Sequence, residues 1–244
     1  MIGTAGWAIP AQHADAFPSD GSHLQRYSSV FRAVEINSSF YRPHRPNTYT
    51  RWAATVPADF RFAVKMPKEI THTRRLVQVE EPLARFLGEV TSLGPKLGPL
   101  LVQLPPSLAF GPVHADFFRA LRDRFAGAIA CEPRHRSWFT DAVDQLLADL
   151  RIARVAADPA LVPRAGEPGG WLGLCYHRLH GSPRMYHSAY TREVLDALAR
   201  RIAGHDGVTW CIFDNTAEGA ASHDAMRLAA LLPRVDEQGP ASPH

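Results

Sequence analysis

The chain has 244 residues, of which 45% are hydrophobic and 21% are charged. This composition supplies a full-sized apolar core and excludes a largely disordered protein. Its 27 basic and 24 acidic residues give a net charge of +3, and they form no concentrated basic stripe of the kind that nucleic-acid-binding proteins carry.

The sequence also bears on where the protein works. No stretch approaches the roughly 18 apolar residues that a membrane-spanning helix needs. The opening residues MIGTAGWAIP do not have the basic and then apolar regions of a signal peptide. Cys131, Cys175 and Cys211 stand singly within apolar runs, as expected of buried thiols in a reducing compartment. We therefore expect a cytoplasmic protein with no membrane partner.

Short apolar runs typical of β-strands recur along the chain. They begin near Ile2, Ala33, Arg61, Pro99, Ala128, Ala153, Trp171 and Val208. On average the runs start about 29 residues apart, which is the length of one strand–helix unit. Because most of them are apolar at nearly every position, they are typical of strands buried on both faces of a parallel sheet.

Segments with apolar residues at helical spacing lie between these runs, at 49–56, 83–90, 117–125, 143–150, 194–202 and 228–232. Segment 158–170, DPALVPRAGEPGG, has no helical period, and its Pro and Gly content predicts a loop. The pattern predicts a single-domain (β/α)8 TIM-type barrel over residues 1–232, with the sixth helix reduced or missing. A disordered tail is expected at 233–244. An open doubly wound sheet is the alternative, although its Gly-rich dinucleotide fingerprint is absent.

Polar and ionisable residues gather where nearly every apolar run ends. In a barrel of this kind the carboxyl ends of the strands meet at one mouth, where active sites lie. We expect the chemistry to be carried by Glu35, Lys65, Glu132, His135 and His180. The residues expected to bind a ligand are Asn37, Tyr41, His72, Gln103, Arg134, Trp138, Tyr176, Arg178 and Asn215.

A purely structural role for these groups is the main alternative. Burying a charge is costly unless it is paired. Glu35 with Lys65, and Glu132 with Arg178, would then form an internal ring of ion pairs without catalysis. If Glu132→Gln and Arg178→Met leave the fold intact, the residues serve a ligand; if both changes unfold the protein, they are structural.

Seven sequence blocks carry a resemblance to a known family. In order they are GTAGW, VEINSSFYR, FRFAVKMPKEITH, LVQLPP, CEPRHRSW, YHRLHG and FDN, and they extend from Gly3 to about Asn215. They resemble the signature blocks of the YecE-like family, catalogued as domain of unknown function 72. The resemblance implies a TIM-type barrel and supplies no established activity, so no catalytic residue is carried over from the family.

The leading hypothesis is an enzyme that uses carboxylate or histidine acid–base chemistry on a small anionic substrate bearing a phosphate or a carboxylate. Lys65, Arg134 and Arg178 supply cations for such an anion. Glu35, Glu132 or a histidine would transfer protons. The sequence requires no cofactor and indicates no particular oligomeric state.

Three other hypotheses remain open. A metal-dependent barrel hydrolase or isomerase would bind a divalent metal such as Zn, Mn or Fe, although HExxH and CxxC spacings are absent. Lys65 would serve as a Schiff-base nucleophile if its amine is desolvated. A non-catalytic module for a ligand or nucleic acid is suggested by the mixture FYRPHRP, but the polar residues are expected at strand ends, which makes nucleic acid the less favoured partner. The potential metal ligands are Glu35, His72, Glu132, His135, Asp158 and His180.

Overall fold

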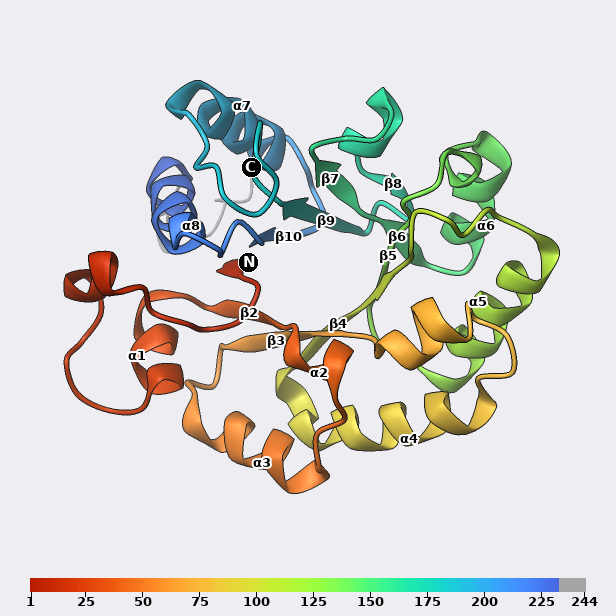
Figure 1. The fold of residues 1–244 in the computed structure, drawn as a ribbon, viewed down its shortest axis with the longest axis horizontal. Helices are drawn as coiled ribbons and strands as arrows, with labels where there is room; N and C mark the ends of the chain where they lie inside the picture. The colour runs from red at the N-terminus through yellow and green to blue at the C-terminus, as the bar shows by residue number, and fades with distance from the viewer. Residues whose placement is uncertain (233–244) are drawn as a thin grey trace, which may run out of the picture.

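A computed structural model describes residues 1–232 as an α/β fold in which helices surround a central group of strands (Figure 1). The predicted disordered tail at 233–244 lies outside the described residues. The strands are β1 (Ile2–Thr4), β2 (Ala33–Ile36), β3 (Arg61–Lys65), β4 (Leu97–Gln103), β5 (Ile129–Glu132), β6 (Ile152–Arg154), β7 (Ala156–Asp158), β8 (Gly169–Gly170), β9 (Leu174–Leu179) and β10 (Val208–Phe213). The α-helices are α1 (His23–Val30), α2 (Ser38–Tyr41), α3 (Pro46–Thr55), α4 (Glu80–Val90), α5 (Pro112–Arg124), α6 (Asp141–Asp149), α7 (Arg192–Ala203) and α8 (Ala220–Leu231). Shorter helical turns are η1 (Ala11–Ala16), the π-helix η2 (Glu69–Thr73), η3 (Thr91–Lys96), η4 (Arg136–Trp138) and η5 (Pro163–Gly166).

The strands form two sheets. One has the order β2-β3-β4-β5-β6-β8, and the other has the order β1-β10-β9-β7. All neighbouring strands run parallel except β6 and β8, which are antiparallel. The sequence therefore predicted the α/β class and the parallel pairing correctly, while the strands appear as two sheets where one closed barrel was expected.

The two sheets meet at both of their borders. At one border the amide of Gly6, just after β1, donates to the carbonyl of Glu35 in β2 over 2.8 Å. At the other border the chain itself passes from one sheet to the other, because β6 and β7 are separated by Val155 alone. The expected sixth strand is thus split, because β6 pairs with β5 while β7 pairs with β9.

The sixth unit lacks an α-helix, as its Pro-rich and Gly-rich sequence predicted. Between β7 and β9 the chain makes the 3₁₀ turn η5 and the two-residue strand β8. Helix α1 was not predicted, because its sequence HLQRYSSV has few apolar residues. Its start is fixed by a capping box, in which the Ser22 hydroxyl and the Gln25 side chain each accept a backbone amide of the other residue.

Two apolar clusters fill the interior. The larger cluster joins helix residues to one face of the strands, for example Val34 and Val64. The smaller cluster contains strand residues of both sheets, among them Ala33, Ala63 and Ala130. Because side chains alternate along a strand, the residue two positions after each of these alanines projects to the same side. None of the helices within residues 1–232 is long and apolar enough to cross a membrane.

Candidate functional site

The alternation of side chains along β9 explains why a polar cluster lies next to the smaller apolar cluster, toward the carboxyl ends of the strands. Tyr176 belongs to the apolar cluster, so Arg178 and His180 follow it on the same side at two-residue intervals. The same rule places Glu35 two residues after Ala33 and carries Asp214 two residues beyond Ile212, which is another member of the cluster. These polar side chains consequently meet near the carboxyl ends of strands from both sheets.

Arg178 lies at the centre of the cluster and is fully buried. Its guanidinium donates to both carboxylate oxygens of Glu35, from Nη2 over 2.7 Å and from Nε over 3.1 Å. Nη1 donates to Glu132 Oε2 over 2.7 Å, and Nη2 also donates to Asp214 Oδ2 over 3.0 Å. One cation therefore holds three buried carboxylates, and Tyr176 donates its hydroxyl proton to Glu35 over 2.9 Å.

His180 is held between two of these carboxylates. Its Nδ1 lies 3.0 Å from Asp214 Oδ2, and its Nε2 lies 3.0 Å from Glu132 Oε1. Glu132 Oε1 also accepts hydrogen bonds from Arg134 Nε and Nη2, at 3.0 and 2.7 Å. Arg134 Nη2 also lies 3.0 Å from His180 Nε2, so three charged groups fix the orientation of the ring.

The charges of the cluster shift the pKa values of the carboxyl groups. Burial by itself would raise the pKa of Glu132, but the charges of Arg178 and Arg134 outweigh it and hold the pKa well below its usual range. Burial and Arg178 oppose each other in the same way at Asp214, and the pKa of Asp214 is lowered as well. Both groups are therefore carboxylates at neutral pH, and each has an oxygen 3.0 Å from a ring nitrogen of His180.

Lys65 differs from the other cations of the cluster because it pairs with no carboxylate. Within residues 1–232 its ammonium makes no hydrogen bond or ion pair; it lies 4.3 Å from the centre of the Phe40 ring. The residue is 6% exposed. Burial and the nearby charge of Arg178 lower the pKa of Lys65 to about 8. The expected alternative pairing of Lys65 with Glu35 is therefore wrong, since Glu35 pairs with Arg178, whereas the pairing of Glu132 with Arg178 is confirmed.

His72 and Gln103 border the cluster. Burial, followed by the charges of Lys65, Lys68 and Arg134, lowers the pKa of His72 to about 4, so its ring is neutral near pH 7. The Gln103 amide donates to Glu132 Oε2 over 3.0 Å. Both residues are thus close to the charged groups, as the sequence predicted.

A cavity of about 280 Å³ opens beside the cluster. Glu132, Arg134 and His180 form its polar side. Arg134 uses Nε and Nη2 on Glu132, and its Nη1 has no hydrogen-bond partner among the described residues. The cavity therefore presents an arginine N–H and a histidine ring to a ligand.

Three residues predicted for the site lie elsewhere. His135 is turned to its own backbone, where Nδ1 accepts from the Ser137 amide and caps η4. Trp138 is fully buried in the larger apolar cluster and donates its indole N–H to the Leu108 carbonyl over 2.8 Å. Asn215 donates to Asp224 and to the Ser188 carbonyl, so it ties the end of β10 to α8.

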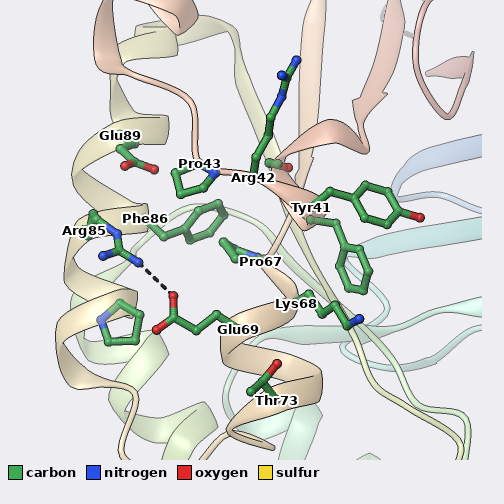
Figure 2. A pocket seen from close by; sticks show the side chains of 13 residues that line it. Tyr41, Arg42, Pro43, Pro67, Lys68, Glu69, Thr73, Arg85, Phe86 and Glu89 are labelled. Atoms are coloured by element: carbon green, nitrogen blue, oxygen red, sulfur yellow. Dashed lines mark hydrogen bonds and ion pairs between the residues drawn. The ribbon is translucent and has the colours of Figure 1, made fainter.

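Tyr41 and Asn37 lie at the edge of the cluster. Tyr41 is 79% exposed and lines a different cavity of about 240 Å³ between α2, η2 and α4 (Figure 2). That cavity is crossed by the ion pair of Arg85 with Glu69, whose atoms are 2.9 Å apart. Asn37 approaches the charge cluster, with its Nδ2 3.5 Å from Asp214 Oδ1.

Asp214 is the cluster member that was missed. The sequence prediction chose its neighbour Asn215 from the FDN block, although the alternation along β10 favours Asp214, two residues after Ile212. Phe40 was considered as an aromatic wall of the pocket but was not among the predicted site residues, and its ring lies 4.3 Å from the Lys65 ammonium. No group of three or more His, Cys, Asp and Glu residues within the described part of the chain is arranged to hold a metal ion.

The strands and the charge cluster at their carboxyl ends define an α/β protein with a polar site between two sheets. The chain belongs to the family described as "Protein of unknown function DUF72", which matches residues 1–244. It is 29% identical over 124 residues to UPF0759 protein YecE of Escherichia coli K12, covering 50% of this chain and 45% of that protein. It is 31% identical over 150 residues to UPF0759 protein YunF of Bacillus subtilis 168, covering 57% and 52%. The chain thus spans about half the length of the curated relatives it matches.

Two solved structures share the fold. A DUF72 family protein from Enterococcus faecalis V583 superposes with a TM-score of 0.78 at 20% identity, covering 99% of this chain and 98% of that one. A DUF72 family protein from Thermotoga maritima MSB8 gives the same TM-score of 0.78 at 23% identity, covering 94% and 98%. At these identities the likeness extends to the fold alone.

Proposed function

We propose that the protein is an enzyme that transfers a proton to or from a small anionic substrate bound in the 280 Å³ cavity. The observation that carries this proposal is the position of His180. Both of its ring nitrogens lie 3.0 Å from a carboxylate oxygen, and the ring also lines the cavity. A histidine fixed by carboxylates has the orientation of its ring set, which suits it to general acid–base catalysis.

The other charged residues of the cluster have different roles in this proposal. Arg134 binds the anion through its free Nη1, and the ammonium of Lys65 adds positive charge nearby. Glu132 and Asp214 position His180 and stay ionised throughout. Glu35 and Arg178 are positioning residues, because they do not line the cavity and are fully buried.

Binding of the anion is tested first. Binding of benzoate, acetate and inorganic phosphate is measured by calorimetry at constant ionic strength. Arg134→Gln should weaken binding of at least one of these anions about tenfold or more, because a charge-assisted hydrogen bond contributes about 1.5–3 kcal/mol. The matched control is Arg136→Gln, an exposed arginine two residues along the chain, which should leave binding unchanged. Absence of binding by all three anions would contradict the proposal.

The acid–base role is tested on turnover. Mixtures of small phosphates and carboxylates are incubated with the protein, and new products are detected by mass spectrometry and by exchange of carbon-bound hydrogen in D₂O. His180→Gln should abolish any turnover while Arg136→Gln retains it. Turnover that persists in His180→Gln would show that another group transfers the proton.

We further propose that the two sheets close into a (β/α)8 barrel. The support is the Gly6–Glu35 hydrogen bond at one border and, at the other, the direct passage of the chain from β6 to β7 through Val155. In a closed barrel the amide of Gly6 should exchange with solvent as slowly as the Val64 amide of β3. Fast exchange at Gly6, measured by NMR, would favour two separate sheets.

Lys65 suggests a second candidate function, the formation of an imine with a carbonyl substrate. Its ammonium has no carboxylate partner among the described residues, and the nitrogen is not among the fully enclosed unpaired polar atoms, so it reaches solvent. The neutral amine would attack the carbonyl carbon, and the oxygen would leave as water to give the iminium. With the pKa of Lys65 at about 8, a measurable share of the amine is neutral near pH 7.5.

Borohydride reduction tests this second function. A 2-oxo acid trapped on Lys65 adds the mass of the acid less one oxygen atom, because formation of the imine releases one water and borohydride reduction then adds two hydrogens. Lys65→Met should lose the adduct and Lys68→Met, an exposed lysine nearby, should keep it. An adduct of equal yield in Lys65→Met would overturn the assignment.

A further inference from the structure

Most of the residues that line the cavity beside His180 are apolar. Apart from Glu132, Arg134 and His180, every lining residue is apolar: Pro106, Pro133, Ala157, Pro159, Ala160, Leu161, Ala165 and Met185. These three residues contact one another, so the polar side chains form a single patch of the lining. A ligand that fits this division has one charged end and an otherwise apolar body.

Two of the apolar lining residues are partly exposed to solvent. Leu161 is 55% exposed and Met185 is 38% exposed, although large apolar side chains are usually buried. Leu161 belongs to the segment before η5, and Met185 belongs to the loop that follows β9. An apolar ligand body would cover both side chains and remove their surface from water.

The polar side of the cavity holds a hydrogen-bond donor for a single carboxylate. Glu132 is ion-paired with both Arg178 and Arg134. Arg134 Nη1 has no hydrogen-bond partner among the described residues, whereas both ring nitrogens of His180 already lie 3.0 Å from carboxylate oxygens. A guanidinium N–H binds a carboxylate by a charge-assisted hydrogen bond.

We propose that the cavity binds an amphipathic monocarboxylate, with its carboxylate on Arg134 Nη1 and its alkyl or aryl body against Leu161 and Met185. This inference rests on the proposed function and names its substrate class. Sugars and nucleotides fit poorly, because their hydroxyl groups would face the apolar wall without hydrogen-bond partners. Benzoate and medium-chain fatty acids have the required chemistry.

A chain-length series tests the inference. The affinities of acetate, butyrate, hexanoate and octanoate are measured by calorimetry. Each methylene buried against the apolar wall should tighten binding about threefold to fourfold, up to the length that fills the cavity. Hexanol and hexylamine serve as probes of the head group, and both should bind at least tenfold more weakly than hexanoate.

Two leucines provide matched variants. Leu161 is 55% exposed and lines the cavity, while Leu172 is 54% exposed and does not. Leu161→Ser should reduce the gain in affinity per methylene and leave acetate binding unchanged. Leu172→Ser should affect neither quantity, so any general effect of removing a surface leucine is controlled.

The outcomes separate this inference from the proposed function. If acetate and hexanoate bind equally well and Arg134→Gln weakens both, the anion site stands and the apolar specificity is wrong. The inference also fails if Leu161→Ser and Leu172→Ser behave alike. If neither carboxylates nor phosphate bind at all, the proposed function fails with it.

Discussion

Arg178 compensates the negative charge of three carboxylates, those of Glu35, Glu132 and Asp214. Its side chain is fully buried and contacts carboxylates from two strands of one sheet and from the end of β10 in the other. Without it, Glu35, Glu132 and Asp214 would remain in a medium of low polarity with Arg134 as their nearest ion-paired cation. Arg178 is therefore as much a structural residue as a positioning residue.

Arg178→Met should reduce the free energy of unfolding by about 3–5 kcal/mol, because it leaves buried carboxylates uncompensated. Urea denaturation measures the loss. The control is Arg119→Met, whose ion pair with Asp116 is exposed on both sides and is worth at most about 1 kcal/mol. A loss of stability for Arg178→Met no larger than that for Arg119→Met would show that the buried carboxylates do not need the arginine as a partner.

Lys65 should make the protein more stable as the pH rises above 8. The pKa of Lys65 is lowered to about 8 in the folded state, whereas an unfolded lysine keeps its proton to about pH 10.4. Between these values the unfolded chain binds more protons, so the free energy of unfolding increases with pH. The gain relative to Lys65→Met should be on the order of 2 kcal/mol.

Urea denaturation at pH 7 and pH 10 measures this difference. Lys68→Met is the control, because Lys68 is exposed and the variant keeps Lys65. Its stability should change with pH as that of the wild type does. A wild type and a Lys65→Met variant with parallel pH profiles would mean that Lys65 is not desolvated.

At the scale of residues, the sequence predicted which side chains converge but could not rank neighbours. Glu35, Lys65, Glu132, Arg178 and His180 do meet, because apolar runs reveal strands and strand ends reveal a common edge. The choice between Asp214 and Asn215 depends on which of two adjacent residues projects toward the cluster. That choice requires the register of β10, which the apolar pattern VTWCIF leaves open.

At the scale of elements, the backbones of β1 and β2 lie so close together that position 3 has no room for a side chain. A Cβ atom built on Gly3 would lie 2.0 Å from the Ala33 carbonyl oxygen of β2. The contact is with backbone, so it cannot be relieved by a rotamer change. Glycine at position 3 is what lets the β1 backbone lie beside β2.

Gly3→Ala should lower the free energy of unfolding by more than 2 kcal/mol, since backbone must move to remove the clash. Gly88→Ala is the matched control within α4. A Cβ there meets nothing within 4 Å, and alanine should stabilise the helix by about 0.5–1 kcal/mol. Thermal unfolding of the two variants should shift in opposite directions, and a shift in the same direction would contradict the packing of β1 on β2.

Strands were predicted from sequence more reliably than helices, for a physical reason. A strand buried on both faces is apolar at nearly every position. Runs such as LLVQL and AIACE are therefore easily recognised as strands. Helix α1 is specified instead by Ser22 and Gln25 at its start, and it buries Leu24, Tyr27 and Ser28. A helix anchored by a cap and one tyrosine gives no long apolar repeat to detect.

For the whole molecule, the charge cluster joins the two sheets through side chains. Glu35 and Glu132 come from one sheet, and Arg178 and Asp214 come from the other. The ion pairs between these residues therefore help to hold the two sheets together, beside the backbone contact of Gly6 with Glu35. The sequence predicted one closed barrel from the number of strands, and the two sheets were not predicted, because the division of the sixth strand at Val155 leaves no trace in residue type.

Acid should therefore destabilise the whole fold. Burial tends to raise the pKa of Glu132, but Arg178 and Arg134 hold it well below its usual range. An unfolded glutamate titrates near pH 4.3, so the stabilisation is complete above that value and is lost as the pH falls toward the folded pKa. The urea midpoint should drop between about pH 5 and pH 2, and less steeply in Glu132→Gln than in Glu81→Gln, an exposed control. Equal slopes in the two variants would exclude Glu132 as a source of acid sensitivity.

The lack of an α-helix between β7 and β9 has a consequence for the shape of the cavity. Leu161 and Ala165 line the cavity from the segment between β7 and β9, which holds only the turn η5 and the short strand β8. The segment is anchored to α6 by the ion pairs of Arg164 with Asp141 and Asp144. Residues on either side of Leu161 can therefore be exchanged while that anchor is kept, which would reshape the cavity wall and leave the ion pairs of Arg178 unchanged.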